Sequence, residues 1–251
     1  MLPISTVIIT LNEERNIRQA LESVKWTDEI VILDSGSTDK TLDICREYPN
    51  CKIYYQEFKG FGEQKQKAIS LATNNWILSI DADEVLDAEL EKNIISLFSS
   101  KNYNQYQGYF IVRTLVFMGK TFRYGRESRE LKIRLFDKNH GNWDDNAVHE
   151  ELVLKGNTGK LKGFLLHYSF RDLHHYFDKF NEYTTQLAIY MKNKNRKMSR
   201  TRSIVRMPLD FLKIYFVYGN CLNGYQGFVW SCLSTFYRFV KFTKYLEMTN
   251  Q

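Results

Sequence analysis

Short apolar runs and amphipathic stretches alternate along the first third of the chain. The strand-like runs span residues 4–10, 29–33, 51–55 and 76–80, and the first reads Ile-Ser-Thr-Val-Ile-Ile-Thr. The stretches with helical spacing span residues 15–25, 40–47 and 62–73, and the first carries Ile17, Ala20, Leu21 and Val24 on one face. This alternation predicts an α/β domain with a mostly parallel, Rossmann-like sheet and flanking helices. Asn12 stands where an N-cap of the first helix is expected.

The second half of the chain is less regular. Strand-like runs span residues 107–117, 131–136, 148–154 and 161–168, some of them antiparallel, and the pattern becomes helical from Arg171. We therefore predict a domain over residues 1–170, with halves 1–85 and 86–170, and a C-terminal helical extension over residues 171–251.

The final apolar segments, Met207–Tyr218 and Gly227–Tyr245, are rich in aromatic side chains but are interrupted by charges. Their apolar runs are shorter than the ~20 residues that a transmembrane helix needs. Helices lying at a membrane interface fit better, because Trp, Tyr and Phe favour that depth. Packing against the rest of the protein is the alternative. The side chains concerned are Trp230, Phe236, Tyr237, Phe239, Phe242 and Tyr245.

Charge divides the chain unevenly. The net charge is +6, but residues 1–150 carry 19 Lys and Arg against 23 Asp and Glu, whereas residues 151–251 carry 16 against 6. Residues 192–206 hold seven basic side chains and no acidic one. The basic part carries no zinc-finger, basic-zipper or RNP pattern, so an anionic membrane surface or acceptor is predicted, and nucleic acid is not.

The composition is that of a globular chain, with 43% apolar and 25% charged residues. The four cysteines form no CxxC pair, which favours reduced thiols in a cytosolic protein. The first ten residues lack the basic region of a signal peptide and are expected to form a strand.

Polar clusters follow three of the predicted strands. They are Thr10–Glu13, Asp34–Asp39 and Asp81–Asp83. Ligands of parallel α/β sheets bind outside the carboxyl ends of the strands, so these clusters predict one nucleotide-sized crevice. Asp81 and Asp83, one residue apart beside a loop, can share a hard divalent cation, for which Mg²⁺ and Mn²⁺ are the candidates.

The order and spacing of these motifs resemble the signature of family 2 glycosyltransferases with a GT-A fold. The motifs are Thr10-Leu11-Asn12-Glu13-Glu14, Asp34-Ser35-Gly36-Ser37-Thr38-Asp39-Lys40-Thr41 and Asp81-Ala82-Asp83-Glu84. The later motifs are similar to the bacterial lipopolysaccharide core transferases that add glucose to inner-core heptose. These later motifs are Gly60 to Ala68, Val148-His149-Glu150, Leu166-His167-Tyr168 and Gly224-Tyr225-Gln226-Gly227.

The resemblance implies a role for individual residues. Asp34 corresponds to the aspartate that holds the uracil or ribose of the donor, and Thr10, Asn12 and Glu13 belong to the loop around the nucleotide. Lys65 stands where many members have Arg and is a candidate nucleotide contact, although its Gln64-Lys65-Gln66 setting departs from the family pattern. Asp81 is expected near the ribose or a metal-bound water.

The metal and the general base follow from the same resemblance. Asp83 is expected to ligate the metal directly, and His149 and His167 are candidates for a metal or diphosphate contact. Glu150 occupies the place of the general base. Its neighbours Asp144, Asp145 and Glu151 are rivals for that role.

The reaction implied is inverting transfer of a hexose, with UDP-glucose as the expected nucleotide-sugar donor, to a lipid-linked or lipopolysaccharide core saccharide. Such transfer needs one base to deprotonate the acceptor hydroxyl and one cation to stabilise the leaving diphosphate. The expected location is peripheral, at the cytoplasmic face of a bacterial inner membrane.

Two other interpretations remain open from the sequence. Asp81-Ala82-Asp83-Glu84-Val85 also fits the DxDx(T/V) loop of haloacid-dehalogenase-like phosphatases, with Asp144-Asp145 as a later metal pair, but that loop normally follows the first strand of its fold. A non-enzymatic membrane-binding module would use the basic residues 192–206 and leave the acidic crevice unexplained.

Overall fold

The computed structural model describes residues 2–143, 152–194 and 199–249. The chain divides into two compact units. The first unit comprises Met1–Thr114 and Glu130–Tyr168, and the second comprises Leu115–Arg129 and Ser169–Gln251. The sequence analysis included residues 115–129 in the first domain, whereas in the structure they group with the C-terminal helices.

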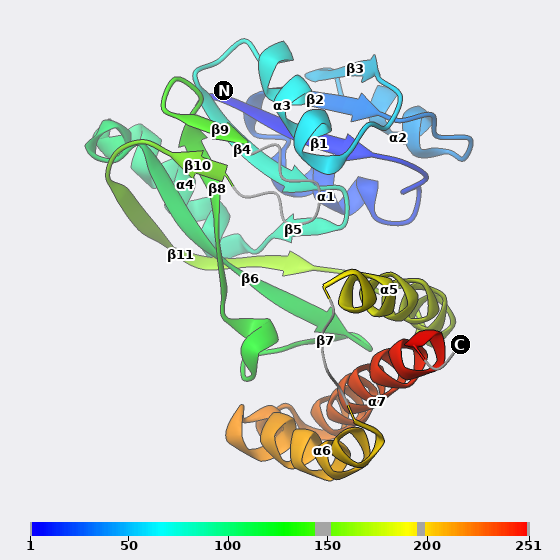
Figure 1. The fold of residues 1–251 in the computed structure, drawn as a ribbon. Coiled ribbons are helices and arrows are strands. Elements are labelled where there is room, and N and C mark those ends of the chain that lie inside the picture. The colour runs from blue at the N-terminus through cyan, green and yellow to red at the C-terminus, as the bar shows by residue number, and fades with distance from the viewer. Residues whose placement is uncertain (1, 144–151, 195–198, 250–251) are drawn as a thin grey trace. The chain divides into compact units, whose positions relative to one another are not determined.

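The first unit is built on the predicted sheet, whose strand order is β3-β2-β1-β4-β8-β6-β11-β5 (Figure 1). Its first four strands in chain order are β1 (Leu2–Thr10), β2 (Thr27–Asp34), β3 (Cys51–Tyr55) and β4 (Trp76–Asp81). These four strands run parallel to one another. The β-branched, apolar runs recognised in the sequence therefore form the parallel half of the sheet, from β3 at its edge to β4, and the predicted α/β fold is confirmed.

Antiparallel strands complete the sheet. They include β5 (Glu84–Leu86), β6 (Gly108–Phe117), β8 (Glu130–Asp137) and β11 (Thr158–His167). Strand β8 pairs with both β4 and β6, and β11 pairs with β5. The short strand β7 (Lys120–Thr121) pairs with β6, while β9 (Gly141–Trp143) pairs with β10 (Leu152–Leu154).

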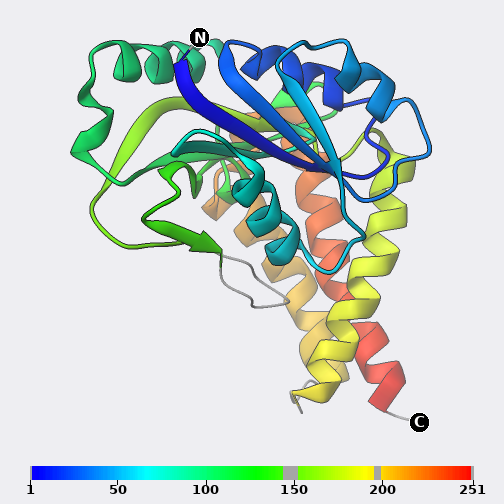
Figure 2. The ribbon, with the colours of Figure 1, turned by 90° about the horizontal axis from the view of Figure 1, so that it is seen from above.

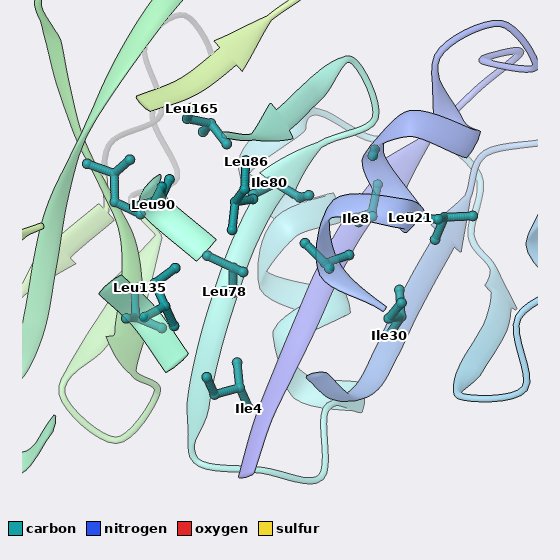
Figure 3. Packing of buried hydrophobic residues seen from close by; sticks show 14 of the residues in the cluster. Ile4, Ile8, Leu21, Ile30, Leu78, Ile80, Leu86, Leu90, Leu135 and Leu165 are labelled. Carbon is teal, nitrogen blue, oxygen red and sulfur yellow. The ribbon is translucent and has the colours of Figure 1, made fainter. Parts of the chain in front are cut away.

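Alternating side chains of the sheet pack against helices on its two faces. One face carries α1 (Ile17–Val24), α2 (Thr41–Arg46) and α4 (Ala88–Ser99), and the other carries α3 (Phe61–Leu71). In β1, Ile4 and Ile8 join the first cluster and Val7 joins the second. Figure 3 shows Leu21 of α1 and Leu90 of α4 with the strand residues. Burying each Ile or Leu side chain stabilises the fold by about 1.5–3 kcal/mol.

Asn12 does not cap α1, which corrects the expectation from the sequence. The helix begins after Asn16. Asn12 has a left-handed backbone, with φ of 55°, and its side-chain oxygen accepts a hydrogen bond from the backbone N–H of Thr38 at 2.8 Å. A cap requires the side chain to turn toward its own helix, whereas this one ties two loops together.

The second unit contains the predicted C-terminal helices. These are α5 (Leu173–Asn193), α6 (Arg200–Leu212) and α7 (Gly224–Thr249). A π-helical turn, Lys213–Val217, continues α6, and 3-10 turns span Arg126–Ser128 and Asn220–Asn223; the first unit has another at Asn102–Gln105. Figure 2 shows α7 lying along α5 and α6, and it packs against both.

The aromatic side chains of α7 largely pack inside the second unit. Trp230 contacts Phe117, Phe122 and Phe170, while Phe242 and Tyr245 pack against Met191. None of the helices in the described residues is both long enough and apolar enough to cross a bilayer.

Candidate active site

Strand register brings the predicted polar residues to one edge of the sheet. Thr10 at the end of β1 pairs with Asp34 at the end of β2, and the neighbouring Ile9 pairs with Asp81 at the end of β4. Because these strands are parallel, their carboxyl ends meet at the same edge. The three predicted clusters therefore lie together, as the βα spacing indicated.

Asp34 is buried and organises the loop that follows it. Its Oδ2 accepts hydrogen bonds from the backbone N–H groups of Gly36 and Ser37, both at 2.8 Å, and its Oδ1 accepts the Ser37 hydroxyl. Gly36 has a φ of 107°, which L side chains rarely adopt. The structure thus gives Asp34 a role in shaping this loop, and its contact with uracil or ribose stays a prediction.

The loop after β1 is tied to the loop after β2. The backbone N–H of Asn12 donates to the Ser37 hydroxyl at 2.9 Å, and that of Glu13 donates to the Thr41 hydroxyl at 2.8 Å. The Glu13 carboxylate accepts from the Asn16 side chain at 2.8 Å. Asn12 and Glu13 therefore join the two loops, while their contact with a nucleotide stays a prediction.

Asp81 is held between two cations. Its Oδ1 lies 3.1 Å from Lys65 Nζ and its Oδ2 lies 2.9 Å from Arg134 Nη2. Burial alone would raise the pKa of Asp81, but the charges of Arg134 and Lys65 and their hydrogen bonds outweigh it and hold that pKa well below its ordinary value. Asp81 is ionised at neutral pH, and both of its oxygens are engaged.

Sequence reasoning missed the residues behind Asp81. Arg134 of β8 also contacts Glu84 Oε1 at 2.6 Å, and Arg113 of β6 reaches the same oxygen at 3.2 Å. The other oxygen of Glu84 accepts the backbone N–H of Asp81 at 3.0 Å. The sequence did contain a signal for this network. Arg134 stands within a predicted strand and three carboxylates stand within residues 81–84, and buried charges of opposite sign are expected to pair.

Asp83 and His167 lie together beside this network. Asp83 Oδ2 is 3.4 Å from His167 Nε2, and the backbone carbonyl of Asp83 accepts the N–H of Tyr168 at 2.8 Å. His167 ends β11, where it pairs with Glu84 of β5. The antiparallel β5–β11 pair therefore brings the histidine to the aspartate, which sequence spacing could only suggest.

A carboxylate and an imidazole at this separation are suitable donors for Mn²⁺, and the carboxylate also suits Mg²⁺. Within residues 2–143, 152–194 and 199–249, no three His, Cys, Asp or Glu side chains gather as a preformed metal site. Asp83 and His167 can therefore supply two ligands, with diphosphate and water oxygens filling the remaining positions.

Besides Arg134 Nε, two buried oxygens at this edge have no hydrogen-bond partner in the described part of the chain. They are Thr10 Oγ1 and Gln64 Oε1. The amide nitrogen of Gln64 does have partners, since it donates to the Ser35 hydroxyl at 2.6 Å and the Gln56 carbonyl at 3.0 Å. Buried polar atoms are usually paired, so these two oxygens can serve a bound ligand.

The predicted base lies outside the described residues, and so do the residues considered with it. These are Glu150, His149, Asp144, Asp145 and Glu151.

Comparison with known proteins agrees with the fold and with the family that the motifs indicated. Residues 5–155 match the family model described as Glycosyl transferase family 2. The chain is 32% identical to the lipopolysaccharide core biosynthesis glycosyltransferase LpsC of Rhizobium meliloti, covering 97% of this chain and 92% of that protein. It is also 32% identical to an uncharacterized glycosyltransferase of Rickettsia typhi, covering 99% and 88%.

Two solved structures share the fold. The mannosyltransferase PcManGT of Pyrobaculum calidifontis, solved with GDP-Man and Mn²⁺, gives a TM-score of 0.54 at 12% identity and covers 98% of this chain and 87% of that one. S. aureus TarS 1-349, solved with UDP-GlcNAc, gives 0.50 at 17% identity, covering 92% and 79%. The fold is therefore of the GT-A type.

The matched family model and the relative LpsC show that the chain is a glycosyltransferase. The chain belongs to glycosyl transferase family 2, as its motifs indicated. The phosphatase interpretation is not supported, because Asp81 and Asp83 follow the fourth strand along the chain and not the first. The non-enzymatic interpretation is excluded by the family.

Proposed function

We propose that this glycosyltransferase is an inverting, divalent-metal-dependent enzyme that transfers a hexose, with glucose expected, from a UDP-sugar to a lipid-linked or lipopolysaccharide core saccharide. The observation that carries the proposal is the pairing of Asp83 with His167 beside an Asp81 held by Lys65 and Arg134. This places a candidate ligand pair next to a fixed anion at the sheet edge where ligands bind.

The donor would occupy the edge formed by the ends of β1, β2 and β4. Thr10 Oγ1 and Gln64 Oε1 offer unused hydrogen-bonding capacity there, and the backbone around Asp34 is already ordered. The neighbour TarS was solved with UDP-GlcNAc, which supports a uridine diphosphate donor. Because this backbone is already ordered, less conformational entropy would be lost when the donor binds.

The divalent ion would be held by Asp83 and His167. PcManGT was solved with Mn²⁺, which supports a divalent ion here. When bound, such an ion neutralises the negative charge that develops on the leaving diphosphate. Lys65 and Arg134 keep Asp81 ionised and fixed, so that Asp81 can accept hydrogen bonds from the ribose or from a water molecule.

Glu150 would act as the general base. It would accept the proton of the acceptor hydroxyl as that oxygen attacks the anomeric carbon and the bond to diphosphate breaks. The proposal comes from the family motif, and Asp144, Asp145 and Glu151 are the rivals to be tested. The relative LpsC, named for lipopolysaccharide core biosynthesis, supports a core saccharide as acceptor.

We also propose that the second unit binds an anionic membrane surface through α6 and the turn that follows it. The exposed apolar side chains there are Ile204, Val205, Met207, Leu209, Leu212, Phe216 and Val217. Arg200, Arg202 and Lys213 lie in the same segment and are exposed. Apolar side chains flanked by cations are typical of helices that lie in a membrane interface.

Replacing Asp83 tests the proposed metal. In Asp83→Asn, UDP-sugar binding that depends on Mn²⁺ should be lost in calorimetry and release of UDP should stop, whereas the fold, measured by circular dichroism, should be unchanged. Asp43→Asn, at an exposed ion pair on α2, is the matched control. Chelation should reproduce the defect in the wild type. Full turnover of Asp83→Asn or of the chelated enzyme would contradict the metal mechanism.

The donor sugar is a separate question. A screen of UDP-sugars that measures UDP release would identify the donor.

A further inference from the structure

The second unit contains a cavity of about 330 Å³, and none of the residues that line it belongs to the candidate active site. Helices α5 and α7 form most of its wall, and the turns at 126–128 and 213–217 close it. The volume lies near the lower end of the ~300–1,000 Å³ typical of small-molecule sites. Its lining includes Glu127, Phe170, Tyr176, Trp230, Tyr237 and Arg238.

Two of the residues in this lining each carry a buried polar atom that has no hydrogen-bond partner in the described residues. These atoms are Glu127 Oε2 and Trp230 Nε1. A buried polar atom that stays unpaired destabilises the folded protein. By contrast, the indole Nε1 of Trp26 donates to the Ser23 carbonyl at 2.9 Å. The orphaned pair therefore points to a ligand that both donates and accepts hydrogen bonds.

A hydroxylated ring meets this requirement. A hydroxyl group can donate to the Glu127 carboxylate, and another can accept from the Trp230 indole. A hydrocarbon chain would fill the same volume but would leave both atoms unpaired. The polar atoms thus distinguish a saccharide from an acyl or prenyl chain.

The aromatic walls suit the other surface of a sugar. Trp230 lies against Phe170 and Tyr176, with ring centroids 6.0 and 6.2 Å away, and Tyr176 is itself buried. The faces of these rings carry negative electrostatic potential and attract the weakly positive C–H groups of a sugar ring. Such aromatic linings with a few polar groups are typical of ligand pockets.

Cations on the wall favour an acidic substituent. Arg238 is matched by Asp210, at 3.1 Å, but Arg126 packs over the Tyr218 ring, 4.2 Å from its centroid, and Lys179 donates to the Ser169 carbonyl. Both remain able to donate to an anion. Charge-assisted hydrogen bonds to phosphate or carboxylate are about twice as strong as neutral ones.

We infer that this cavity binds a saccharide ring that carries a phosphate or carboxylate group, and that it recognises the acceptor, a role that rests on the proposed function. Glu127 and Trp230 orient the ring through its hydroxyl groups, and Arg126 and Lys179 contact the acidic group. The site would then select the acceptor by its own sugar and charge, independently of the donor.

Binding can be measured without turnover, using the full chain and ¹⁵N-labelled tryptophan. Glucose 6-phosphate should shift the Trp230 indole resonance, assigned through Trp230→Phe, and glucose should do so more weakly. Decanoate and inorganic phosphate should not shift it, and the Trp26 resonance should stay in place with every probe. A Trp230 shift caused by decanoate or by phosphate alone, or no shift with either sugar up to about 50 mM, would overturn the inference.

Activity separates this inference from the proposed function. Trp230→Phe and Glu127→Gln should raise the acceptor KM at least tenfold and leave calorimetric UDP binding unchanged, while Glu182→Gln, on the exposed surface of α5, should change neither. If transfer occurs and both variants keep the wild-type acceptor KM, the acceptor role is wrong. If the wild type transfers no sugar at all but the Trp230 resonance still responds to glucose 6-phosphate, the proposed function fails and the saccharide site stands.

Discussion

Arg134 is the residue on which the acidic site depends most. Its side chain is only 4% exposed and lies between Asp81 and Glu84, of which Glu84 is completely buried. Removing one partner from such a network leaves an uncompensated charge in a poorly solvated place. The burial of Arg134 would by itself lower its pKa, but the two carboxylates raise it, so the residue is a permanent cation.

We therefore expect Arg134→Met to lower the free energy of unfolding by about 3–5 kcal/mol, measured by urea unfolding. Adding Glu84→Gln should recover part of the loss, because the fully buried Glu84 carboxylate would otherwise keep only Arg113 as a cationic partner. The control is Arg18→Gln, which breaks an exposed ion pair with Glu47 and should leave the urea midpoint unchanged. Equal midpoints for Arg134→Met and the wild type would mean that the network contributes nothing to stability.

Glu150 is the residue whose replacement tests the proposed chemistry most directly. Glu150→Gln keeps the size of the side chain but cannot accept a proton, so the transfer rate should fall by about 10²-fold or more while UDP-sugar binding changes little. The measurements are UDP release and calorimetry. Asp144→Asn, Asp145→Asn and Glu151→Gln are the comparison variants. An active Glu150→Gln beside an inactive variant of one of these three would reassign the base.

At the scale of elements, Glu29 joins three strands and a loop. It is 3% exposed in β2, accepts the Ser5 hydroxyl of β1, pairs with Lys52 of β3 at 2.6 Å, and accepts the backbone N–H of Thr73 at 2.8 Å. Burial would raise the pKa of Glu29, but the hydrogen bonds from Lys52, Ser5 and Thr73 outweigh it and lower that pKa below its ordinary 4.5. A carboxylate with a lowered folded pKa stabilises the protein above its unfolded pKa.

The lowered pKa of Glu29 in the folded protein determines how the stability of Glu29→Gln, relative to the wild type, should depend on pH. Near pH 7 the variant should be about 2 kcal/mol less stable than the wild type, because a charged hydrogen-bond acceptor is lost. As the pH falls below about 4.5, the Glu29 carboxylate takes up a proton, first in the unfolded chain and then in the folded protein. The difference in stability between the wild type and the variant should therefore shrink. Urea unfolding of the wild type and the variant between pH 7 and about 3.5 measures the stability difference and its change with pH. A difference that is constant or grows toward low pH would contradict the assignment.

At the scale of the whole molecule, the separation of charge follows the separation into units. The excess of cations lies after residue 150, in the part of the chain that also exposes the apolar side chains of α6. The aromatic residues of α7 that the sequence suggested for the interface largely pack within the second unit instead. The apolar contribution to membrane binding should therefore come from α6.

Replacing Lys194, Arg196, Lys197, Arg200 and Arg202 together with Gln should release the protein from anionic liposomes, since each nearby cation contributes about 1 kcal/mol. Leu209→Ser with Phe216→Ser should weaken binding that persists at high salt. The charge-matched control replaces Lys25, Lys92, Lys101, Lys160 and Lys162, all exposed in the first unit. Co-sedimentation at low and high salt measures binding. Unchanged sedimentation of the five-fold variant would show that this segment is only a solvated surface.

The order of the βα units, the α/β class and the family could all be predicted from the sequence. These follow from local information, because hydrophobic period indicates each strand and helix, and the three polar motifs stand directly at strand ends. Thr10, Asp34 and Asp81 could be predicted to meet because parallel strands carry their carboxyl ends to one edge. Helix α4 was not predicted.

Long-range strand pairing brings together the residues that complete the site. Arg134 reaches Asp81 because β8 pairs with β4, and His167 reaches Asp83 because β11 pairs with β5. Strand order depends on long-range packing, so no local period in the sequence records it. The same holds for Glu127 and Trp230, which come from distant segments and line one cavity of the second unit. Which side chains act together is therefore determined by their proximity in the folded protein and not by their spacing along the chain.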